Sequence, residues 1–456
     1  MEWIPLPIGV ENFEDLREHG YYFVDKTLFI KELLDMKGKV NLFTRPRRFG
    51  KTLNMSILRY FFEKGDQDNS RLFQGLKIMD TGEKYLSHMG KYPVISVSLK
   101  SMKQYSFELA YDMLKKAVRE EYRRHWEQVK NSGKLGDAEA ERYERIRDLK
   151  GTESDYADSL KFLSECLYVC TGQRSIILID EYDVPLENAY FSGFYDRMVA
   201  LIRSLFESAL KTNDNLEFAV VTGCLRISKE SIFTGLNNLN VVSITTNSFA
   251  EHFGFTPEEV EQMLKDYGLE ENMETVRKWY DGYLFGESEV YNPWSVINYV
   301  NSCYGDKKVF AKPYWSNTSS NSIVKNLIEH ADLSVRQEIE GLIAGDTITK
   351  PIHEDITYDD MNSTQDNLWN FLFFTGYLKK IREEQEDETV RMEMAIPNSE
   401  VRYVYKNAVL QWFEKKTEKK ELTPLYESLL SGDGDKMAEI LSENLMETIS
   451  FYDYQE

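Results

Sequence analysis

Cysteine is scarce in this chain: it occurs four times in 456 residues, at Cys166, Cys170, Cys224 and Cys303. Their spacing fits neither a zinc site nor the disulfide framework of a small secreted protein. No run of eighteen apolar residues is present, which excludes a membrane-spanning helix from the prediction. The N-terminus lacks the basic start and apolar core of a signal peptide. These absences predict a cytoplasmic protein that does not contact a membrane.

Positive charge is also in short supply. Lysine and arginine number 55 against 76 aspartates and glutamates, which gives a net charge of -21. Because nucleic-acid phosphates are bound by positive side chains, this balance excludes a nucleic-acid surface spread over the whole body. Only a local basic patch remains open. The length is sufficient for two or three domains, and the 42% hydrophobic content supplies sizeable cores for them.

Glycine is missing where a phosphate loop has its first one. Residues 39–58, KVNLFTRPRRFGKTLNMSIL, follow the order strand, short loop, helix. This is the layout of a P-loop, but the pattern G-x-x-x-x-G-K-[ST] meets Arg45 in place of its first glycine. Gly50 would let the backbone approach the phosphates, Lys51 would reach the β- and γ-phosphates, and the Thr52 hydroxyl would ligate Mg²⁺. The alternative is a basic loop before an ordinary helix. The nucleotide contacts predicted from this loop are Arg45, Pro46, Arg47, Arg48, Phe49, Gly50, Lys51, Thr52 and Leu53.

A second informative stretch, SIILIDEYDVPL, covers residues 175–186. Its apolar run, Ile176–Ile179, is typical of a strand buried on both faces. The run ends in Asp180 and Glu181, as a Walker B strand does. Asp180 would hold Mg²⁺, and Glu181 would polarise the attacking water as a base. The alternative is a parallel core strand that is merely capped by acids.

With these motifs in place, the sequence resembles the bacterial and archaeal AAA-ATPase-like proteins. The matching motifs run in order through most of the chain: PIGVENFEDL, YYFVDKT, RPRRFGKT, LIDEYDVPL, VVTGCLRISKESIFTGLNN, FGFTPEEV, WYDGYLFG, VYNPWSVINY, FFTGYLKK and AIPNSEVR. The family also carries arginines in its phosphate loop, so Arg45 agrees with the resemblance. The resemblance implies an ATP-binding domain related to STAND-type signalling ATPases.

The resemblance also assigns a role to Arg226. In STAND-type ATPases the strand beside Walker B ends in a polar residue and an arginine that sense the γ-phosphate. The apolar stretch Leu216–Val221 occupies that place here, and Arg226 follows it. A guanidinium fork suits a pair of phosphate oxygens. The alternative partner for Arg226 is a nearby acid such as Glu230.

Alternation of strands and helices predicts an α/β fold with a doubly wound, mostly parallel sheet of the P-loop NTPase kind. We expect this core over residues 1–247, with its N-terminal segment near the adenine end of the site. The alternative for that segment is a purely structural one, a helix cap made by Asp25 or Thr27. Residues 248–345 are predicted to form a helical lid, in which Thr256, Pro257 and Glu259 have the pattern of a capping box with proline in the first turn.

Residues 346–416 resemble a winged-helix module, because a helix, a hairpin and a second helix follow one another. The hairpin tip is EEQEDE, whose charge would repel DNA phosphate. This favours an intramolecular or protein contact for the module. Residues 417–456 are predicted to be a helical spacer towards a missing C-terminal domain.

Members of the resembled family are commonly fused to a C-terminal PD-(D/E)XK nuclease domain. Such a nuclease needs Glu-x-Lys on a buried strand, where the acids hold Mg²⁺. Here Glu-x-Lys occurs only at residues 414–416 and 418–420, inside the solvated charge run FEKKTEKKE. We therefore expect no nuclease activity from this chain.

The function predicted from the sequence is an ATP-Mg²⁺-dependent switch with slow hydrolysis. Its catalytic residues would be Glu181, Lys51 and Arg226, and its metal ligands Thr52 and Asp180. One alternative is a nucleotide-binding scaffold that does not hydrolyse ATP. Another is a DNA-associated regulator acting through the winged-helix-like region, with nucleic acid contacted only indirectly. A protein partner or a homo-oligomer is also left open.

Overall fold

A computed structural model describes most of the chain. The described residues are 3–65, 67–225, 232–233, 237–315, 324–325, 328, 332–354, 358, 364–387, 389–418, 428, 430–431 and 433–438.

The core is a five-stranded sheet whose strands all run parallel, in the order β2-β3-β4-β1-β5. Every residue of β3 is buried, which is why its sequence is an unbroken apolar run ending in an acid. The predicted α/β fold with a parallel sheet is confirmed. The strands are β1 (Val40–Thr44), β2 (Val94–Ser98), β3 (Ser175–Asp180), β4 (Leu216–Gly223) and β5 (Leu239–Val242).

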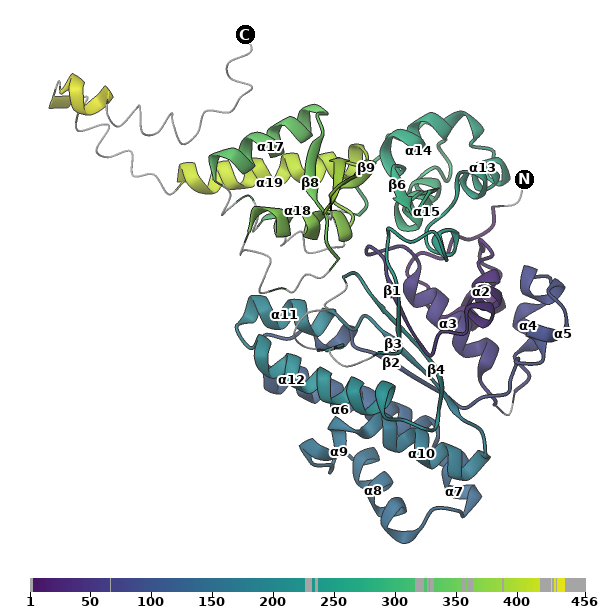
Figure 1. Cartoon of the computed structure of the whole chain (residues 1–456). Helices are drawn as coiled ribbons and strands as arrows, with labels where there is room; N and C mark the ends of the chain where they lie inside the picture. Colours follow the sequence, from purple (N-terminus) through teal and green to yellow (C-terminus); the bar gives the residue numbers. More distant parts are fainter. Residues whose placement is uncertain are drawn as a thin grey trace.

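Helices cover both faces of this sheet (Figure 1). Helices α2 and α3 lie on one face, and α6, α10 and α12 lie on the other. The bounds of the helices in the core are α1 (Phe13–Glu18), α2 (Leu28–Met36), α3 (Lys51–Phe62), α4 (Ser70–Phe73), α5 (Glu83–Leu86), α6 (Phe107–Arg124), α7 (Trp126–Ser132), α8 (Asp137–Arg147), α9 (Glu153–Ala157), α10 (Ser159–Thr171), α11 (Val184–Ser192) and α12 (Tyr195–Phe206).

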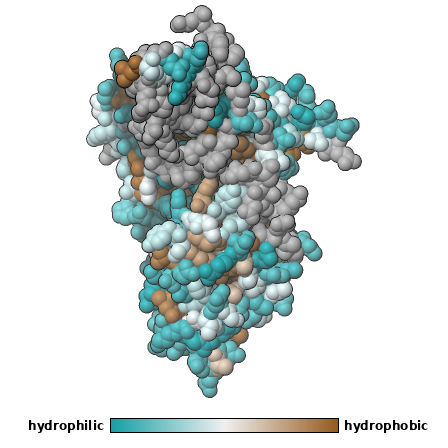
Figure 2. Space-filling model, turned by 90° about the vertical axis from the view of Figure 1, so that its left-hand side faces the viewer, coloured by the Kyte–Doolittle hydropathy of each residue, from teal (hydrophilic) through white to brown (hydrophobic). Residues whose placement is uncertain are grey.

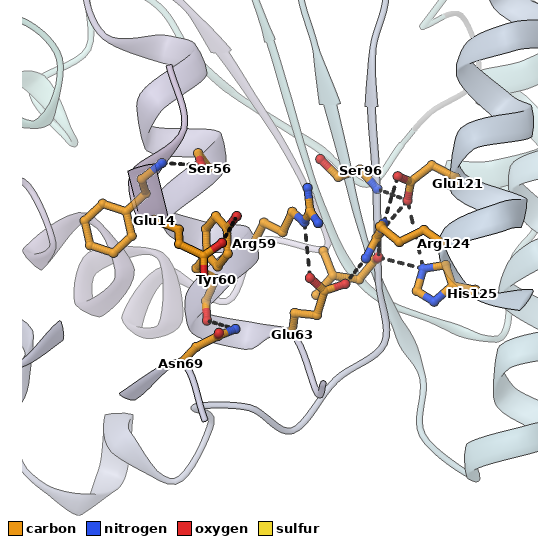
Figure 3. Close-up of polar contacts among 12 residues, drawn as sticks. Glu14, Ser56, Arg59, Tyr60, Glu63, Asn69, Ser96, Glu121, Arg124 and His125 are labelled. Atoms are coloured by element: carbon orange, nitrogen blue, oxygen red, sulfur yellow. Dashed lines mark hydrogen bonds and ion pairs between the residues drawn. The ribbon is translucent and has the colours of Figure 1, made fainter. Parts of the chain in front are cut away.

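A partly buried ion network ties the C-terminal end of α3 to β2 and α6 (Figure 3). Arg59 donates to Glu63 at 3.1 Å, and Arg124 pairs with both Glu63 and Glu121. Glu121 also accepts from the main-chain N–H of Ser96 at 2.8 Å. Burial raises the pKa of Glu121 to about 8. These contacts fix the C-terminal end of α3 against the sheet. The N-terminal end of the same helix directly follows the phosphate loop.

A second apolar core lies beside the sheet and is built by helices α13 to α15 together with the N-terminal segment. Trp3, Leu6, Tyr22 and Val24 pack into it. The predicted capping box is confirmed: Thr256 accepts from the N–H of the third helical residue, whose side chain returns the bond. The elements are α13 (Pro257–Asp266), α14 (Met273–Tyr280), β6 (Tyr283–Phe285), β7 (Ser288–Val290) and α15 (Pro293–Ser302).

The C-terminal part contains an antiparallel sheet in the order β8-β10-β9 with helices packed against it. Helix, hairpin and helix follow one another as the sequence predicts, and β8 joins the hairpin as a further strand. The prediction that the whole acidic stretch forms the hairpin tip is corrected, because residues 383–386 belong to β9 and pair with β10. The winged-helix assignment and the domain boundaries stay predictions, and the predicted spacer 417–456 lies mostly outside the described residues. The elements are α17 (Leu333–Ala344), β8 (Ile348–Pro351), α18 (Gln365–Phe374), β9 (Lys379–Glu386), β10 (Thr389–Ala395) and α19 (Ser399–Glu418).

The surface is mainly polar where it can be seen. On the face shown in Figure 2, the described residues are mostly hydrophilic, with separate hydrophobic spots between them. Among the helices of the described ranges, none has both the length and the apolar character that a membrane crossing requires.

Gly282 marks a close approach between the second core and the C-terminal part. It has φ +95°, and a Cβ there would overlap the carbonyl oxygen of Pro397. We expect Gly282→Ala to lower the free energy of unfolding by about 1–2 kcal/mol for its left-handed backbone and by a further roughly 1–3 kcal/mol for the overlap. Urea unfolding measures this loss. Gly305→Ala is the control, because Gly305 has φ +84° but open space at its Cβ. Equal losses in the two variants would contradict a steric role for Gly282.

Candidate nucleotide-binding site

The loop between β1 and α3 turns the amino end of α3 towards a cavity. Arg48 has φ +72° and Gly50, the N-cap of α3, has φ +81°. A Cβ at Gly50 would meet no atom within 4 Å, so the glycine faces open space. The first N–H groups of α3 and its dipole therefore face a site that favours an anion. The loop has the shape of a phosphate loop although Arg45 replaces its first glycine.

The cavity in front of this loop has a volume of about 340 Å³, which lies in the range of sites for small ligands. Residues 47–54 and Glu181 line its polar end. The other end is apolar and is lined by Val10, Phe23 and Val24 from the N-terminal segment and by Trp294 and Ile297 around the start of α15. The N-terminal segment thus lines the cavity, and its place at the adenine end of a nucleotide stays a prediction.

Lys51 and Thr52 begin α3 and meet the end of β3. The Lys51 ammonium donates to the carbonyl oxygens of Arg45 and Pro46, each at 2.9 Å. The Thr52 hydroxyl donates to a carboxylate oxygen of Asp180 at 2.8 Å, and the other oxygen of Asp180 accepts from Thr222. Strand β4 lies between β1 and β3, which places Thr222 beside Asp180. The two predicted metal ligands are therefore in direct contact.

Glu181 follows β3 and lies at the same cavity. Its backbone is left-handed, with φ +54°, which is rare for a residue with a Cβ. Burial raises the pKa of the Glu181 carboxyl, and the charge of Asp180 adds to the rise, while Lys51 opposes it. A carboxylate of raised pKa beside a phosphate-binding loop has the properties of a general base.

Arg45 and Pro46 correct part of the prediction, because neither side chain lines the cavity. Arg45 is fully buried, and its guanidinium lies 5.2 Å from the ring centre of Phe253 and 5.0 Å from that of Phe285. It donates to the carbonyl oxygen of Val242 at 2.9 Å. Burial lowers the pKa of Arg45 to about 9. The arginine fills the core behind the loop and does not face a ligand.

The next two arginines of the loop differ from Arg45 because both line the cavity. Arg47 forms an ion pair with Glu187 of α11. Burial acts to lower the pKa of Arg47, but the charge of Glu187 together with those of further acidic groups around it outweighs burial, and the pKa is raised. Arg48 stacks over the ring of Trp294 at 4.3 Å. Arg48 thus links the phosphate end of the cavity to its apolar end.

The remaining predicted contacts lie on two sides of the loop. Leu53 lines the cavity. Phe49 also belongs to the cavity wall, but its ring is buried against Tyr283 and Phe285, with ring centres 4.9 and 5.2 Å away. The predicted phosphate sensor, Arg226, lies outside the described residues.

Two further residues at or beside the cavity are not among the predicted site residues. Asp183 accepts from the N–H groups of Cys224 and Leu225 at 2.7 and 3.3 Å, and thus holds the chain directly before residue 226. Lys26 forms an ion pair with Glu259 at the start of α13. The motif LIDEYDVPL contains Asp183 and could have drawn attention to it. The pair of Lys26 and Glu259 could not be predicted, because only the fold brings these two residues together.

The donor set at the loop fits Mg²⁺. Thr52 and Asp180 supply two adjacent oxygen ligands of the kind that this ion prefers. No cluster of three or more histidine, cysteine, aspartate or glutamate side chains that would hold a metal occurs in the described part of the chain. Mg²⁺ is usually bound by one or two carboxylates together with phosphate and water, which agrees with Thr52 and Asp180 as adjacent oxygen donors.

The chain is similar to known proteins in sequence and in structure. The family model described as predicted AAA-ATPase matches residues 7–233. An uncharacterized protein in the vnfD 5′ region of Azotobacter chroococcum mcd 1 is 26% identical over 438 residues, which cover 94% of this chain and 74% of that protein. The Walker-type ATPase PABY2304 of Pyrococcus abyssi has 16% identity and a TM-score of 0.42, and the match covers 89% of this chain and 99% of that one. The family match includes the phosphate loop and both acids at the end of β3.

Proposed function

Residues 7–233 belong to the predicted AAA-ATPase family, and from this premise we propose that the chain is a slow ATP-Mg²⁺-dependent ATPase that acts as a nucleotide-controlled switch. The observation that carries the proposal is that Lys51, Thr52 and Glu181 line one cavity and that Thr52 bonds Asp180 directly. Two sequence motifs far apart in the chain meet there in the arrangement that phosphoryl transfer needs.

Each of these residues has a role in the proposed reaction. The N–H groups at the start of α3 and the Lys51 ammonium bind phosphate oxygens. Thr52 and Asp180 hold the metal, which when bound neutralises charge on the phosphates. Glu181, with its raised pKa, accepts a proton from the attacking water. Arg47 and Arg48 add positive charge at the loop, and Arg226 remains the proposed γ-phosphate sensor.

The switch role is supported by what lies behind the loop. Gly376 lies so close to Pro46 that a Cβ there would come within 2.9 Å of the proline ring. The ring of Phe49 packs on Tyr283 and Phe285 of β6. A change of loop conformation on nucleotide binding would therefore be felt both by the proposed lid, 248–345, and by the proposed winged-helix-like module, 346–416.

The contacts of the lid support the same proposal. Lys26 pairs with Glu259, and Nε2 of His252 donates to a carboxylate oxygen of Glu32 at 2.8 Å. Both pairs connect the phosphate-loop core to the start of the proposed lid. The core and the proposed lid both contribute residues to the cavity wall. A nucleotide in this cavity would contact both sides, which is the differential contact that a switch requires.

The DNA-regulator alternative is disfavoured by the hairpin of β9 and β10. The side chains of β9 from Ile381 to Glu386 are exposed. Four of these six residues are glutamate or glutamine, so this part of the strand has no net positive charge. Phosphate would be repelled from this surface. The non-hydrolysing scaffold remains the competing proposal, and only a rate measurement separates it from the switch.

A nucleotide titration with and without Mg²⁺ tests the site. We expect Thr52→Ala to remove most of the gain in ATP affinity that Mg²⁺ gives. The expected loss of affinity in the presence of Mg²⁺ is about tenfold, which is the value of one charge-assisted contact. Asp180→Asn should act in the same way, and neither change should weaken metal-free binding as strongly. Ser56→Ala is the control, because Ser56 is a hydroxyl residue on the same helix that bonds Phe13 outside the cavity. An unchanged Mg²⁺ effect in Thr52→Ala would contradict the proposed metal site.

A further inference from the structure

Lys100 lies at the carboxyl edge of the sheet, beside the acids of β3. Strand β2 pairs with β3 so that Ser98 is opposite Asp180, and the N–H of Leu99 donates to the carbonyl oxygen of Asp180 at 3.0 Å. Lys100 therefore follows β2 where Glu181 follows β3. Both residues line the cavity in front of the phosphate loop. A lysine is thus placed on the side of the cavity that lies across from the loop.

The ammonium of Lys100 pairs with Glu11 at 2.8 Å. The side chains are 56% and 46% exposed, so the pair stabilises the fold only weakly, by about 0–1 kcal/mol. Glu11 also lines the cavity and directly precedes Asn12, the N-cap of α1. Partial burial acts to lower the pKa of Lys100, but Glu11 and then Glu181 outweigh it and the pKa is raised. The charges of Glu11 and Glu181 therefore both reach this lysine.

The other described cations of the cavity for which a partner is known are held more firmly. Lys26 and Arg47 pair with the largely buried acids Glu259 and Glu187. Lys51 is bound to two loop carbonyls, as described above. Lys100 differs because its partner is an exposed carboxylate within the same cavity, which an entering anion can replace at little cost.

We propose that Lys100 exchanges Glu11 for the γ-phosphate when ATP enters the cavity, and so acts as a built-in cation that recognises the terminal phosphate. The inference rests on the proposed function. A charge-assisted contact to a phosphate oxygen is stronger than an exposed pair with a carboxylate. With a diphosphate the lysine keeps Glu11. Lys100, which lies across the cavity from the phosphate loop, thereby gives the site a means to distinguish ATP from ADP.

The test compares the affinities of the β,γ-imido analogue of ATP and of ADP, both with Mg²⁺, by titration calorimetry. We expect Lys100→Ala to lower the preference for the triphosphate by about tenfold, because one charge-assisted contact is lost. Glu11→Gln should raise triphosphate affinity by about two- to fivefold, since a competing exposed ion pair is removed. ADP affinity should stay unchanged in Glu11→Gln, and Lys100→Arg should keep most of the preference.

The control for a purely structural role is Arg71→Ala. Arg71 pairs with Glu14 and Glu18 and so ties α1 to the body outside the cavity, much as Lys100 does within it. This variant should leave the preference unchanged. If Lys100→Ala and Glu11→Gln change the preference in the same direction, or if neither changes it, the pair is a structural tether and the inference is wrong. If the wild-type chain binds neither nucleotide, the proposed function itself fails, which is a different result.

Discussion

Replacing Lys51 by alanine is expected to weaken ATP binding by at least about a hundredfold. The ammonium would contact the β- and γ-phosphates from the start of α3, and two contacts between charged groups are each worth roughly 1.5–3 kcal/mol. In the structure the same nitrogen is held by the carbonyl oxygens of Arg45 and Pro46, which places it at the loop before any ligand binds. Fluorescence titration with ATP and Mg²⁺ measures the loss.

Lys39→Ala is the matched control for this prediction. Lys39 directly precedes the other end of β1 and also donates to two main-chain carbonyl oxygens, those of Leu216 and Glu217. Its removal takes away the same kind of contact without touching the cavity. Lys39→Ala should therefore keep wild-type ATP affinity. If Lys51→Ala binds ATP as well as the wild type does, the phosphate-loop hypothesis ends.

The elements that carry the site could be predicted because each has a local signal. The apolar run Ile176–Ile179 predicts β3, since a strand covered on both faces has no polar side to show. The order of strand, loop and Gly50-Lys51-Thr52 predicts the turn into α3. Thr256 and Glu259 predict the start of α13, because a capping box needs both residues at that spacing.

Other features could not be predicted because they depend on residues brought together by the fold. Strand β5 has only four residues, three of them half-buried, so its apolar pattern is weak. Arg45 in a basic loop suggests an anion contact, and only the rings of Phe253 and Phe285 reveal its place in the core. The apolar end of the cavity joins Val24 to Trp294, which no motif connects.

Glu181→Gln should lower the rate of ATP hydrolysis by about a hundredfold to ten-thousandfold, the usual effect of losing a positioned base. Glutamine keeps the shape and the hydrogen bonding of the side chain but cannot accept the proton of the attacking water. ATP affinity should stay near that of the wild type, because the glutamate acts on water and not on the nucleotide. Glu181→Gln should therefore trap the ATP-bound form, whereas Asp180→Asn loses Mg²⁺-dependent binding. Phosphate release measures the hydrolysis rate, and protease protection of residues 248–416 detects the trapped ATP-bound form.

The pH profile distinguishes a base from a residue that only shapes the cavity. Burial, with the charge of Asp180 added, raises the pKa of Glu181. The carboxyl therefore becomes protonated at a higher pH than an ordinary glutamate, whose pKa is about 4.3. Wild-type hydrolysis should fall as the pH drops through this raised pKa, and Glu181→Gln should lose that limb of the profile. Glu108→Gln, an exposed glutamate that pairs with Arg197, is the control and should keep it. If the wild type hydrolyses ATP no faster than Glu181→Gln at any pH, the chain by itself is a nucleotide-binding module.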